Sequence, residues 1–463
     1  MATTFPAFAS PARPSAARAG TGAARLAAFS TLMIPIYAAQ MPIGVYLPAI
    51  YAQHYGISLA LLGTIFLIAK TWGAFADPLI GALSDRTRSR FGRRKPWIVA
   101  GAAIFGLSGV ALFFPPNPVP PIEVGLALFG FYLGWSMLWI PYLAWAGELS
   151  ADYHERTRVA TYQNVIGAAS LLLVLLLPTI VDQLRPSDAT LKLGAMGGVI
   201  LLSLVPSLLL TLGAYDEPAA PRTPARRPAL LAAFGIVLRD GLLMRVLLSD
   251  FAVTLGQNIR GTLFVFFVSS YMGLPRWASG LFLFQFAFGI VAGPIWMRIA
   301  QRLGKHRTAV LGELLQVAIN LGLLLVVPGR LPLLLALTFA QGLAQGSGNL
   351  MLRAMVADVA DRHRLESGQD RTALFFSVFS ISMKAAMAVA VGIALPLVAW
   401  LGFDPAAAHN SPPALRALLL VFTLGPALAH LVSAALVAGF PLDEATHADI
   451  RRALDAEAPA TRF

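Results

Sequence analysis

The side chains most able to do chemistry in this sequence are ionisable groups that lie inside long apolar segments. Lys70 and Asp77 fall in one such segment, and Lys384 falls in another. An ionisable side chain at bilayer depth costs at least ~2.5–3.5 kcal/mol on insertion scales, so each of these residues needs a partner or a task. In a helix, seven residues make two turns, which places Lys70 and Asp77 on one face, about 10 Å apart along the axis. A carboxyl group near an amine in this setting can bind and release a proton.

Aromatic rings form a second group of candidates within a single apolar segment. Trp135, Trp139 and Tyr142 have the i, i+4, i+7 spacing of one helix face. Such rings stack on sugar faces or on apolar ligands, whereas tryptophan also occurs in the belts at membrane interfaces. We interpret Trp139 and Tyr142 as substrate contacts and Trp145 as a belt residue.

Amide and guanidinium groups in other apolar segments are candidate hydrogen-bond donors to a substrate. Arg260 offers a five-donor fork suited to a carboxylate or a phosphate. Asp250 lies ten residues earlier, about 15 Å away along a helix, and is too distant to pair with it directly. Arg260 therefore indicates an anionic substrate, unless it pairs across helices or extends to the membrane surface. The remaining candidate substrate ligands are Tyr37, Gln40, Gln163, Asn164, Gln257, Asn258, Gln345 and Asn349.

The composition requires a membrane to position these groups. Of the 463 residues, 57% are hydrophobic and 13% are charged, against roughly 45–50% and about 25% in soluble domains. A span takes about 20 apolar residues and forms a helix, because lipid offers the backbone no hydrogen bonds. Twelve apolar segments occur, at 25–51, 59–83, 97–114, 122–147, 159–182, 192–214, 241–272, 277–299, 307–327, 331–357, 372–402 and 413–440.

These segments divide the chain into two halves. The proline-rich, charged stretch within 215–240 predicts a cytoplasmic linker between a six-helix bundle at 25–214 and a second at 241–440. Residues 1–24 are rich in Ala, Pro, Ser and Gly, so we expect a disordered cytoplasmic tail and no signal peptide. Residues 441–463 are expected to form a mixed-charge cytoplasmic tail with a short helix. The predicted fold class is an all-α membrane protein with twelve transmembrane helices.

The distribution of basic residues predicts the orientation of the chain. The net charge is +12, but the basic residues lie in short tracts between apolar segments, which disfavours nucleic-acid binding. The tracts 86–95 and 298–307 follow even-numbered segments, which places those connections and both termini in the cytoplasm. We expect a multi-pass protein of a bacterial-type inner membrane. The chain has no cysteine, which excludes disulfides and thiolate metal sites.

A signature loop carries a family resemblance. The stretch Asp77-Pro78 through Gly81, Asp85-Arg86 and Gly92-Arg93-Arg94-Lys95-Pro96-Trp97 resembles that of the major facilitator superfamily and, more narrowly, of the glycoside–pentoside–hexuronide:cation symporters, the group of the sodium/melibiose symporter. A second block agrees, with Met355-Val-Ala-Asp358-Val-Ala-Asp361 and later Met383-Lys384. The resemblance runs from about 28 to 440. It implies two six-helix bundles that alternate access to a site between them.

The resemblance also implies roles for individual residues. Asp77 would bind the coupling cation, with Lys384 as its charge partner and Lys70 nearby. The alternative is a static Asp77–Lys384 bridge that holds the two halves together. The residues implied to gate the cytoplasmic side are Asp85, Arg86, Arg93, Asp358 and Asp361. The alternative for the arginines is that they only fix the orientation of the helices in the membrane.

The sequence departs from the family pattern at the sites for cation and sugar. Sodium-using members have a second carboxylate where this chain has Gly73, and a lone aspartate favours H⁺ over Na⁺; uniport and exchange stay open. The sugar-binding aspartates and arginine of melibiose-type members fall at Trp139, near Tyr37 and at Asn164. These losses disfavour a melibiose-like substrate.

Three functions follow from these observations. The first is proton-coupled transport of a glycoside, uronide or related organic acid. The second is transport or export of an amphiphilic or aromatic non-sugar substrate, and the third is a non-transporting sensor or assembly factor on the same fold. Neither a Gly-x-x-x-x-Gly-Lys-Ser/Thr loop nor a His-Glu-x-x-His pair is present, so we expect no enzyme, metal or cofactor. The expected partners are a small-molecule substrate and the lipid bilayer, and the expected state is a monomer.

Overall fold

A computed structural model describes residues 22–149, 152–185, 188–217, 235 and 237–457 of the chain, and these residues form helices without strands. The first half contains α1 (Ala23–Ser30), α2 (Met33–Met41), the π-helical turn η1 (Pro42–Tyr46), α3 (Leu47–Gln53), α4 (Leu59–Arg86), α5 (Lys95–Phe113), α6 (Pro121–Glu148), α7 (Tyr153–Leu184) and α8 (Ala189–Ala214). The second contains α10 (Gly241–Phe266), η2 (Phe267–Tyr271), η3 (Pro275–Trp277), α11 (Ala278–Leu303), α12 (Lys305–Gly322), η4 (Leu323–Leu325), α13 (Leu331–Ala344), α14 (Ser347–Ser367), α15 (Thr372–Trp400), α16 (Pro412–Val437) and α17 (Glu444–Glu457).

The predicted membrane helices are confirmed, with one of them interrupted. Eleven helical segments of the described chain are long and apolar enough to cross a bilayer. The segment expected at 331–357 is instead split into α13 and α14, because Gly346 adopts a left-handed backbone with φ of 86°. A left-handed residue ends one helix and starts another without continuing the hydrogen-bond ladder.

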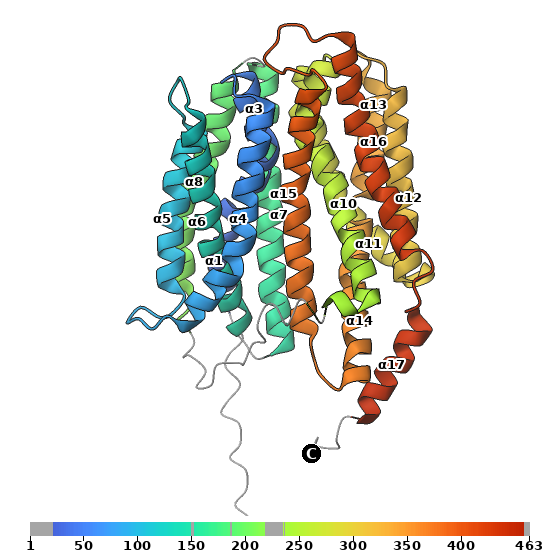
Figure 1. The fold of residues 1–463 in the computed structure, drawn as a ribbon. Helices are drawn as coiled ribbons and strands as arrows, with labels where there is room; N and C mark the ends of the chain where they lie inside the picture. Colours follow the sequence, from blue (N-terminus) through green and yellow to red (C-terminus); the bar gives the residue numbers. More distant parts are fainter. Residues whose placement is uncertain (1–21, 150–151, 186–187, 218–234, 236, 458–463) are drawn as a thin grey trace, which may run out of the picture.

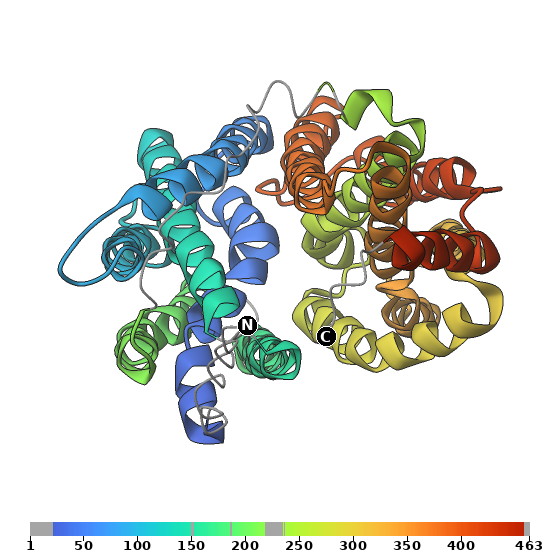
Figure 2. The same ribbon diagram turned by 90° about the horizontal axis from the view of Figure 1, so that it is seen from below.

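The helices form two bundles that lie side by side (Figure 1). Seen along the helix axes, α4 lies beside α15 and α7 beside α11, and these pairs join the halves (Figure 2). We call the end with loop 87–94 and α17 the basic end, and the end with turns 54–58 and 272–277 the far end. The predicted tail at 1–24 and linker at 215–240 lie mostly outside the described residues, although α1 begins within the tail, at Ala23. The short helix expected near the C-terminus is α17.

Many large apolar side chains point outward. Trp400 is 82% exposed, Leu202 79% and Leu107 74%. Such exposure on nearly every long helix is expected for a surface covered by lipid tails rather than water.

Small residues let the helices approach closely where lipid provides no hydrophobic driving force. The α5–α6 pair has the most extensive packing in the first half. A Cβ added at Gly134 would lie 2.5 Å from the backbone nitrogen of Phe105. The two backbones are in contact at this point, so a side chain cannot be accommodated by a rotamer change.

We expect Gly134→Leu to separate α5 from α6 and to destabilise the fold by about 1–3 kcal/mol or more, the usual cost of overpacking. The measurement is the thermal unfolding of purified protein in detergent. Gly198→Leu is the matched control, because a Cβ at Gly198 meets no atom within 4 Å. Equal stability of the two variants would contradict this account of the packing.

Candidate functional site

One ion pair joins the two halves within the membrane-spanning helices α4 and α15. The Nζ atom of Lys384 on α15 contacts Oδ2 of Asp77 on α4, with side chains 30% and 14% exposed. The other carboxylate oxygen of Asp77 is buried and has no hydrogen-bond partner among the described residues. Lys70 is half-buried and makes no ion pair with any described residue. Asp77 and Lys384 thus meet as the resemblance implied, whereas Lys70 stands two turns away as a separate positive charge.

The far end of the molecule is closed by contacts between the halves. The backbone N–H of Ser279 on α11 donates to Oδ2 of Asp182 on α7 at 3.2 Å. The Nε2 atom of Gln183 donates to the carbonyl of Arg276 at 2.9 Å. Asp182 is also paired with Lys192 of its own half. The far ends of the two bundles are therefore in direct polar contact.

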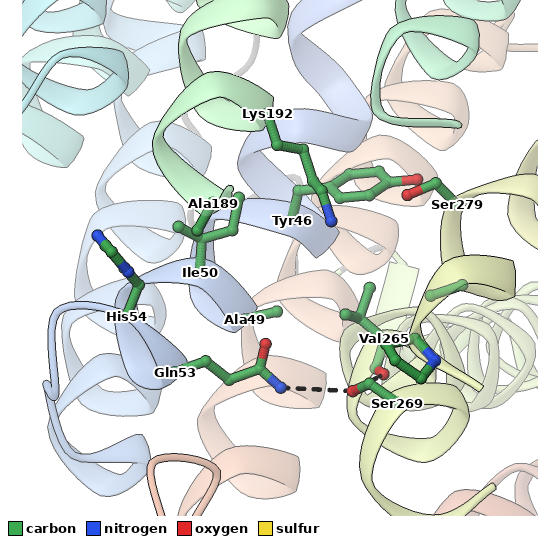
Figure 3. Close-up of a pocket in the computed structure, with 12 residues that line it drawn as sticks. Tyr46, Ala49, Ile50, Gln53, His54, Ala189, Lys192, Val265, Ser269 and Ser279 are labelled. Atoms are coloured by element: carbon green, nitrogen blue, oxygen red, sulfur yellow. Dashed lines mark hydrogen bonds between the residues drawn. The ribbon is translucent and has the colours of Figure 1, made fainter. Parts of the chain in front are cut away.

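A small cavity lies behind these contacts (Figure 3). Its volume is about 220 Å³, and Tyr46, Lys192 and Ser279 are among the lining residues. Gln53 Nε2 of the first half donates to Ser269 Oγ of the second at 3.4 Å beside it. Both residues line the cavity, so this hydrogen bond joins the two halves at the cavity wall.

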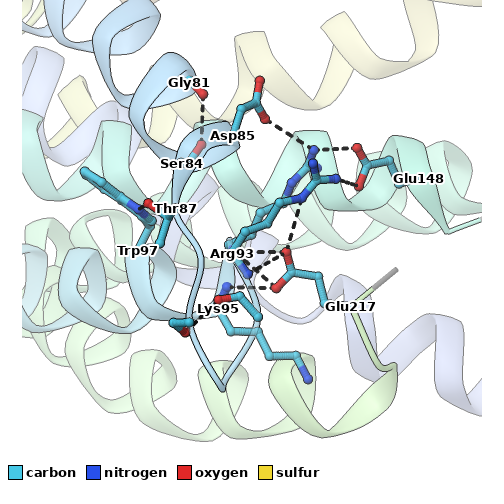
Figure 4. Close-up of polar contacts among 12 residues, drawn as sticks. Gly81, Ser84, Asp85, Thr87, Arg93, Lys95, Trp97, Glu148 and Glu217 are labelled. Carbon is cyan, nitrogen blue, oxygen red and sulfur yellow. Dashed lines mark hydrogen bonds and ion pairs between the residues drawn. The ribbon is translucent and has the colours of Figure 1, made fainter. Parts of the chain in front are cut away.

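At the basic end, the predicted gating residues Asp85 and Arg93 bond within their own half (Figure 4). Arg93 donates to Glu148 at 2.6 Å and Arg94 donates to the same carboxylate at 2.5 Å. Asp85 lies 3.6 Å from Arg94. Glu217 accepts backbone N–H groups of Arg93 at 3.1 Å and Arg94 at 2.9 Å, so it caps the start of α5.

Arg86 does not join this network. Its side chain is exposed and no ion pair connects it to another described residue. The residues that do complete the network, Arg94, Glu148 and Glu217, were not among the predicted gating residues. Glu148 and Glu217 each follow the end of an apolar segment, and this position is the sequence feature that could have identified them as partners of the arginines.

The second half repeats this arrangement. Asp358 on α14 accepts from Lys305 at 2.7 Å and lies 3.3 Å from His447 of α17. Asp361 lies 3.1 Å from His447 and 3.4 Å from Arg451. Both predicted gating aspartates thus attach α14 to elements of its own half.

Two predicted substrate ligands meet in the first half. The rings of Tyr37 on α2 and Trp139 on α6 have centroids 6.3 Å apart, and both are partly exposed. Gln40 is partly exposed one turn after Tyr37, and Asn164 on α7 is exposed. The exposed guanidinium of Arg353, from α14 of the other half, lies within electrostatic range of Tyr37. An aromatic group of the first half and a positive charge of the second therefore interact electrostatically across the boundary between the halves.

The structure does not support the roles predicted for three residues of α6 and α7. Tyr142 is fully buried, donates to the carbonyl of Phe29 at 3.1 Å and stacks on its ring. Gln163 is also buried. Trp145 is not a belt residue, because its ring is fully buried between Phe29 and the Nζ atom of Lys95. Helical spacing gave the correct face, but neighbouring helices cover that face at Tyr142 and Trp145.

Arg260 lies inside the second half rather than between the halves. It is 4% exposed, donates to Oδ1 of Asn320 on α12 at 2.9 Å and lies over the ring of Phe422 at 5.4 Å. Pairing across helices is therefore its role in this structure, and it does not face an open cavity. Asn258 likewise donates to the carbonyl of Thr254 in its own helix at 2.8 Å.

The other polar predictions of the second half lie around the break between α13 and α14. Gln257 donates to Asn349 at 2.9 Å, and Asn349 donates to Asp250 at 3.3 Å. Gln345 is partly exposed, and its Oε1 atom has no partner. A buried pair that was not predicted, Glu313 and His430, lies nearby with Oε2 and Nδ1 2.5 Å apart.

Residues 28–444 match the family described as MFS/sugar transport protein. The chain belongs to this family. It is similar to an uncharacterised symporter of Synechocystis sp., sll1374, at 25% identity over 87% of the chain and 91% of the relative. It is also similar to the isoprimeverose transporter of Lactiplantibacillus pentosus at 24% identity (87% and 85%) and to the sphingosine-1-phosphate transporter MFSD2B of Xenopus tropicalis at 23% identity (95% and 93%).

Solved structures give the same fold. The nucleoside transporter NupG superposes with a TM-score of 0.69 at 13% sequence identity, covering 89% of the chain and 98% of that protein. The predicted major facilitator fold and the resemblance to glycoside–cation symporters are thus confirmed. The chain is a membrane-embedded transporter of a small molecule and not an enzyme.

Closure of the far end predicts a disulfide between the halves. A Cβ at Gly280 would lie 3.6 Å from Cγ2 of Thr179, so side chains at these two positions are in contact across the halves, as a disulfide requires. In Thr179→Cys/Gly280→Cys, oxidation is expected to consume both thiols, as measured by gel shift with a maleimide polymer, because the native chain has no cysteine. Thr179→Cys/Gly198→Cys is the control and should keep both thiols. Two free thiols after oxidation of the first variant would show that the far end is not closed.

Proposed function

We propose that this transporter moves a small organic anion by proton-coupled alternating access. The observation that carries the proposal is the contact of Asp77 with Lys384 between the halves. Because this ion pair connects two halves that move relative to each other, its protonation is coupled to their separation. The symporter among the relatives supports coupled transport.

The pair gives a simple coupling cycle. With Asp77 ionised, its attraction to Lys384 holds α4 against α15. A proton that binds the carboxylate neutralises it and removes this attraction, so the halves are released to rotate. The position one turn earlier is Gly73, where an added Cβ would meet the Tyr132 side chain at 3.6 Å. A single carboxylate suits a proton better than Na⁺, which prefers several hard oxygen ligands.

The charges at the boundary between the halves favour an anionic substrate. Lys70 is half-buried without an ion pair among the described residues, and the exposed Arg353 lies within electrostatic range of Tyr37. Asp77 is already matched by Lys384. The surplus is therefore positive, and a uronide or another organic acid would neutralise it. This assigns to Arg353 and Lys70 the anion-binding role that the sequence suggested for Arg260.

An anionic amphiphile is the second candidate substrate. The Tyr37 and Trp139 rings occupy positions where melibiose-type members have carboxylates, and rings bind apolar groups as well as sugar faces. The relative named as a sphingosine-1-phosphate transporter matches 95% of the chain, whereas the relative named for isoprimeverose matches 87%. Both substrate classes are consistent with one aromatic, positive site.

We further propose that the basic end faces the cytoplasm of a bacterial-type inner membrane. Arg93, Arg94 and Lys95 lie at this end together with α17. Basic residues near membrane helices are retained on the cytoplasmic side. The structure then corresponds to a transporter closed towards the outside, acting as a monomer.

Asp77→Asn is expected to abolish proton-driven accumulation in proteoliposomes, because an amide cannot take up the coupling proton. The measurement is the uptake of labelled sugars, uronides and anionic amphiphiles under an imposed proton gradient. Wild type should concentrate one of them, and the variant should only equilibrate it. Asp404→Asn, in an exposed loop, is the control that should behave as wild type.

Two outcomes would contradict the proposal. Equal accumulation by wild type and Asp77→Asn would remove Asp77 from coupling. Failure of the whole panel to move, while a known transporter works in the same liposomes, would favour export of another compound or a non-transporting role.

Trp139→Ala is expected to raise the half-saturation concentration of the transported solute about 2- to 10-fold, since a ring contact contributes ~0.5–1.5 kcal/mol. Trp400→Ala removes a ring that is 82% exposed and is the matched control. Competition by unlabelled uronides against anionic amphiphiles, measured on wild type, identifies the substrate class. An unchanged half-saturation concentration in Trp139→Ala would exclude that ring from the site.

A further inference from the structure

A buried polar cluster lies inside the second half, apart from the Asp77–Lys384 pair. We call Asp250 of α10, Glu313 of α12, Asn349 of α14 and His430 of α16 the C-half cluster. Asp250 is fully buried, and Glu313 and His430 are each 1% exposed. Asn349 donates to Oδ1 of Asp250 at 3.3 Å, and His430 lies 2.5 Å from Glu313. Four helices thus direct titratable or polar groups to one interior position.

The charges of the C-half cluster do not balance. Asp250 and Glu313 lie close enough for their charges to repel, and His430 can neutralise one of them. Oδ2 of Asp250 is buried and has no partner among the described residues. An unmatched carboxylate at bilayer depth is costly, and one bound proton removes the excess charge. The arrangement is that of a site built to take up a proton.

The neighbouring cations are committed to other partners. Arg260 donates to Asn320, and Lys384 pairs with Asp77. Arg245, earlier on α10, donates to the carbonyls of residues 436 and 438. Arg353 on α14 is exposed and lies within electrostatic range of Tyr37, and Arg416 lies near the other end of α16. Among the described residues, His430 is therefore the one basic group in contact with a carboxyl group of the cluster, and that group is Glu313.

The C-half cluster abuts the break in the predicted tenth span. The first turn of α14 starts at Ser347, after Gly346, and no side chain caps it. A Cβ added at Gly348 would overlap the Glu313 carboxylate, so this carboxyl group lies against the helix start. Helix N-termini favour negative charge. Protonation of Glu313 would weaken its hold on α14.

The cluster also connects to predicted substrate ligands. Asn349 bonds to Asp250 through its amide nitrogen and accepts from Gln257 through its oxygen, at 2.9 Å. A change in the charge of Asp250 alters the donor bond of Asn349 and, through it, the position of Gln257. These two hydrogen bonds link the cluster to the polar residues of α10 and α14 that were predicted to line the pathway.

We propose that the C-half cluster is a second proton-binding site, in which Asp250, Glu313 and His430 share one exchangeable proton. Its occupancy sets the position of α14 through Asn349. Binding converts a carboxylate and a proton into a carboxylic acid, or a neutral imidazole and a proton into an imidazolium ion, and water is the source of the proton. The link to transport rests on the proposed function; the binding of the proton does not.

The test is pH-difference infrared spectroscopy on the full-length protein in liposomes, with the proton itself as the probe. A carboxyl group that gains a proton produces a carboxylic-acid C=O band. Asp250→Asn and Glu313→Gln are each expected to remove or shift one band that persists in Asp77→Asn. His430→Gln should displace the pH at which this band appears, because it removes the group that shares the proton.

Asp404→Asn, in an exposed loop, is the matched control and should leave the buried-carboxyl bands unchanged. Spectra of Asp250→Asn and Glu313→Gln that match wild type would overturn the second site, whatever the transport assay gives. A band lost in these variants, together with no proton-driven uptake by wild type, would uphold the site and refute the proposed transport cycle. Thermal unfolding of each variant establishes that the spectra come from folded protein.

Discussion

The cost of charge in hydrocarbon governs the interior of this transporter. The membrane-spanning helices of the described chain expose apolar side chains to the lipid, so each ionisable group within the bundles needs a partner. Asp77 has Lys384, Asp182 has Lys192, and Glu313 has His430. Lys70 has no ion pair, and Oδ2 of Asp250 has no hydrogen-bond partner, among the described residues, so these two groups are also able to respond to a substrate or a proton. Stability and function therefore derive from the same pairing rule.

The polar contacts differ between the two ends of the molecule. At the far end, hydrogen bonds run from one half to the other, as between Asp182 and Ser279. At the basic end, the arginine and aspartate networks around Glu148 and Asp358 bind helices of the same half. Strong bonding within each half keeps a bundle rigid while the contact between halves changes. This division suits two bodies that rock about the Asp77–Lys384 contact.

The sequence predicted the helices well and the site only in part. Spans follow from apolar length, and loop 87–94 from its motif, because both are local properties. The partners of buried groups are not local: Glu313 and His430 are 117 residues apart, and helix periodicity does not show which neighbour covers Tyr142. The rule that flagged Asp77 applies equally to Glu313 and His430, which lie in predicted spans. The break at Gly346 depends on one backbone angle, which composition does not reveal.

That break divides the second half into two mechanical units. α13 packs mainly on α11, whereas α14 packs on α10, α12 and α17. With Gly346 between them, α14 can tilt without moving α13 and without breaking helical hydrogen bonds. The helical wall of the pathway therefore has a hinge. The pathway can widen or narrow near the basic end through a tilt of α14, while the contacts at the far end stay closed.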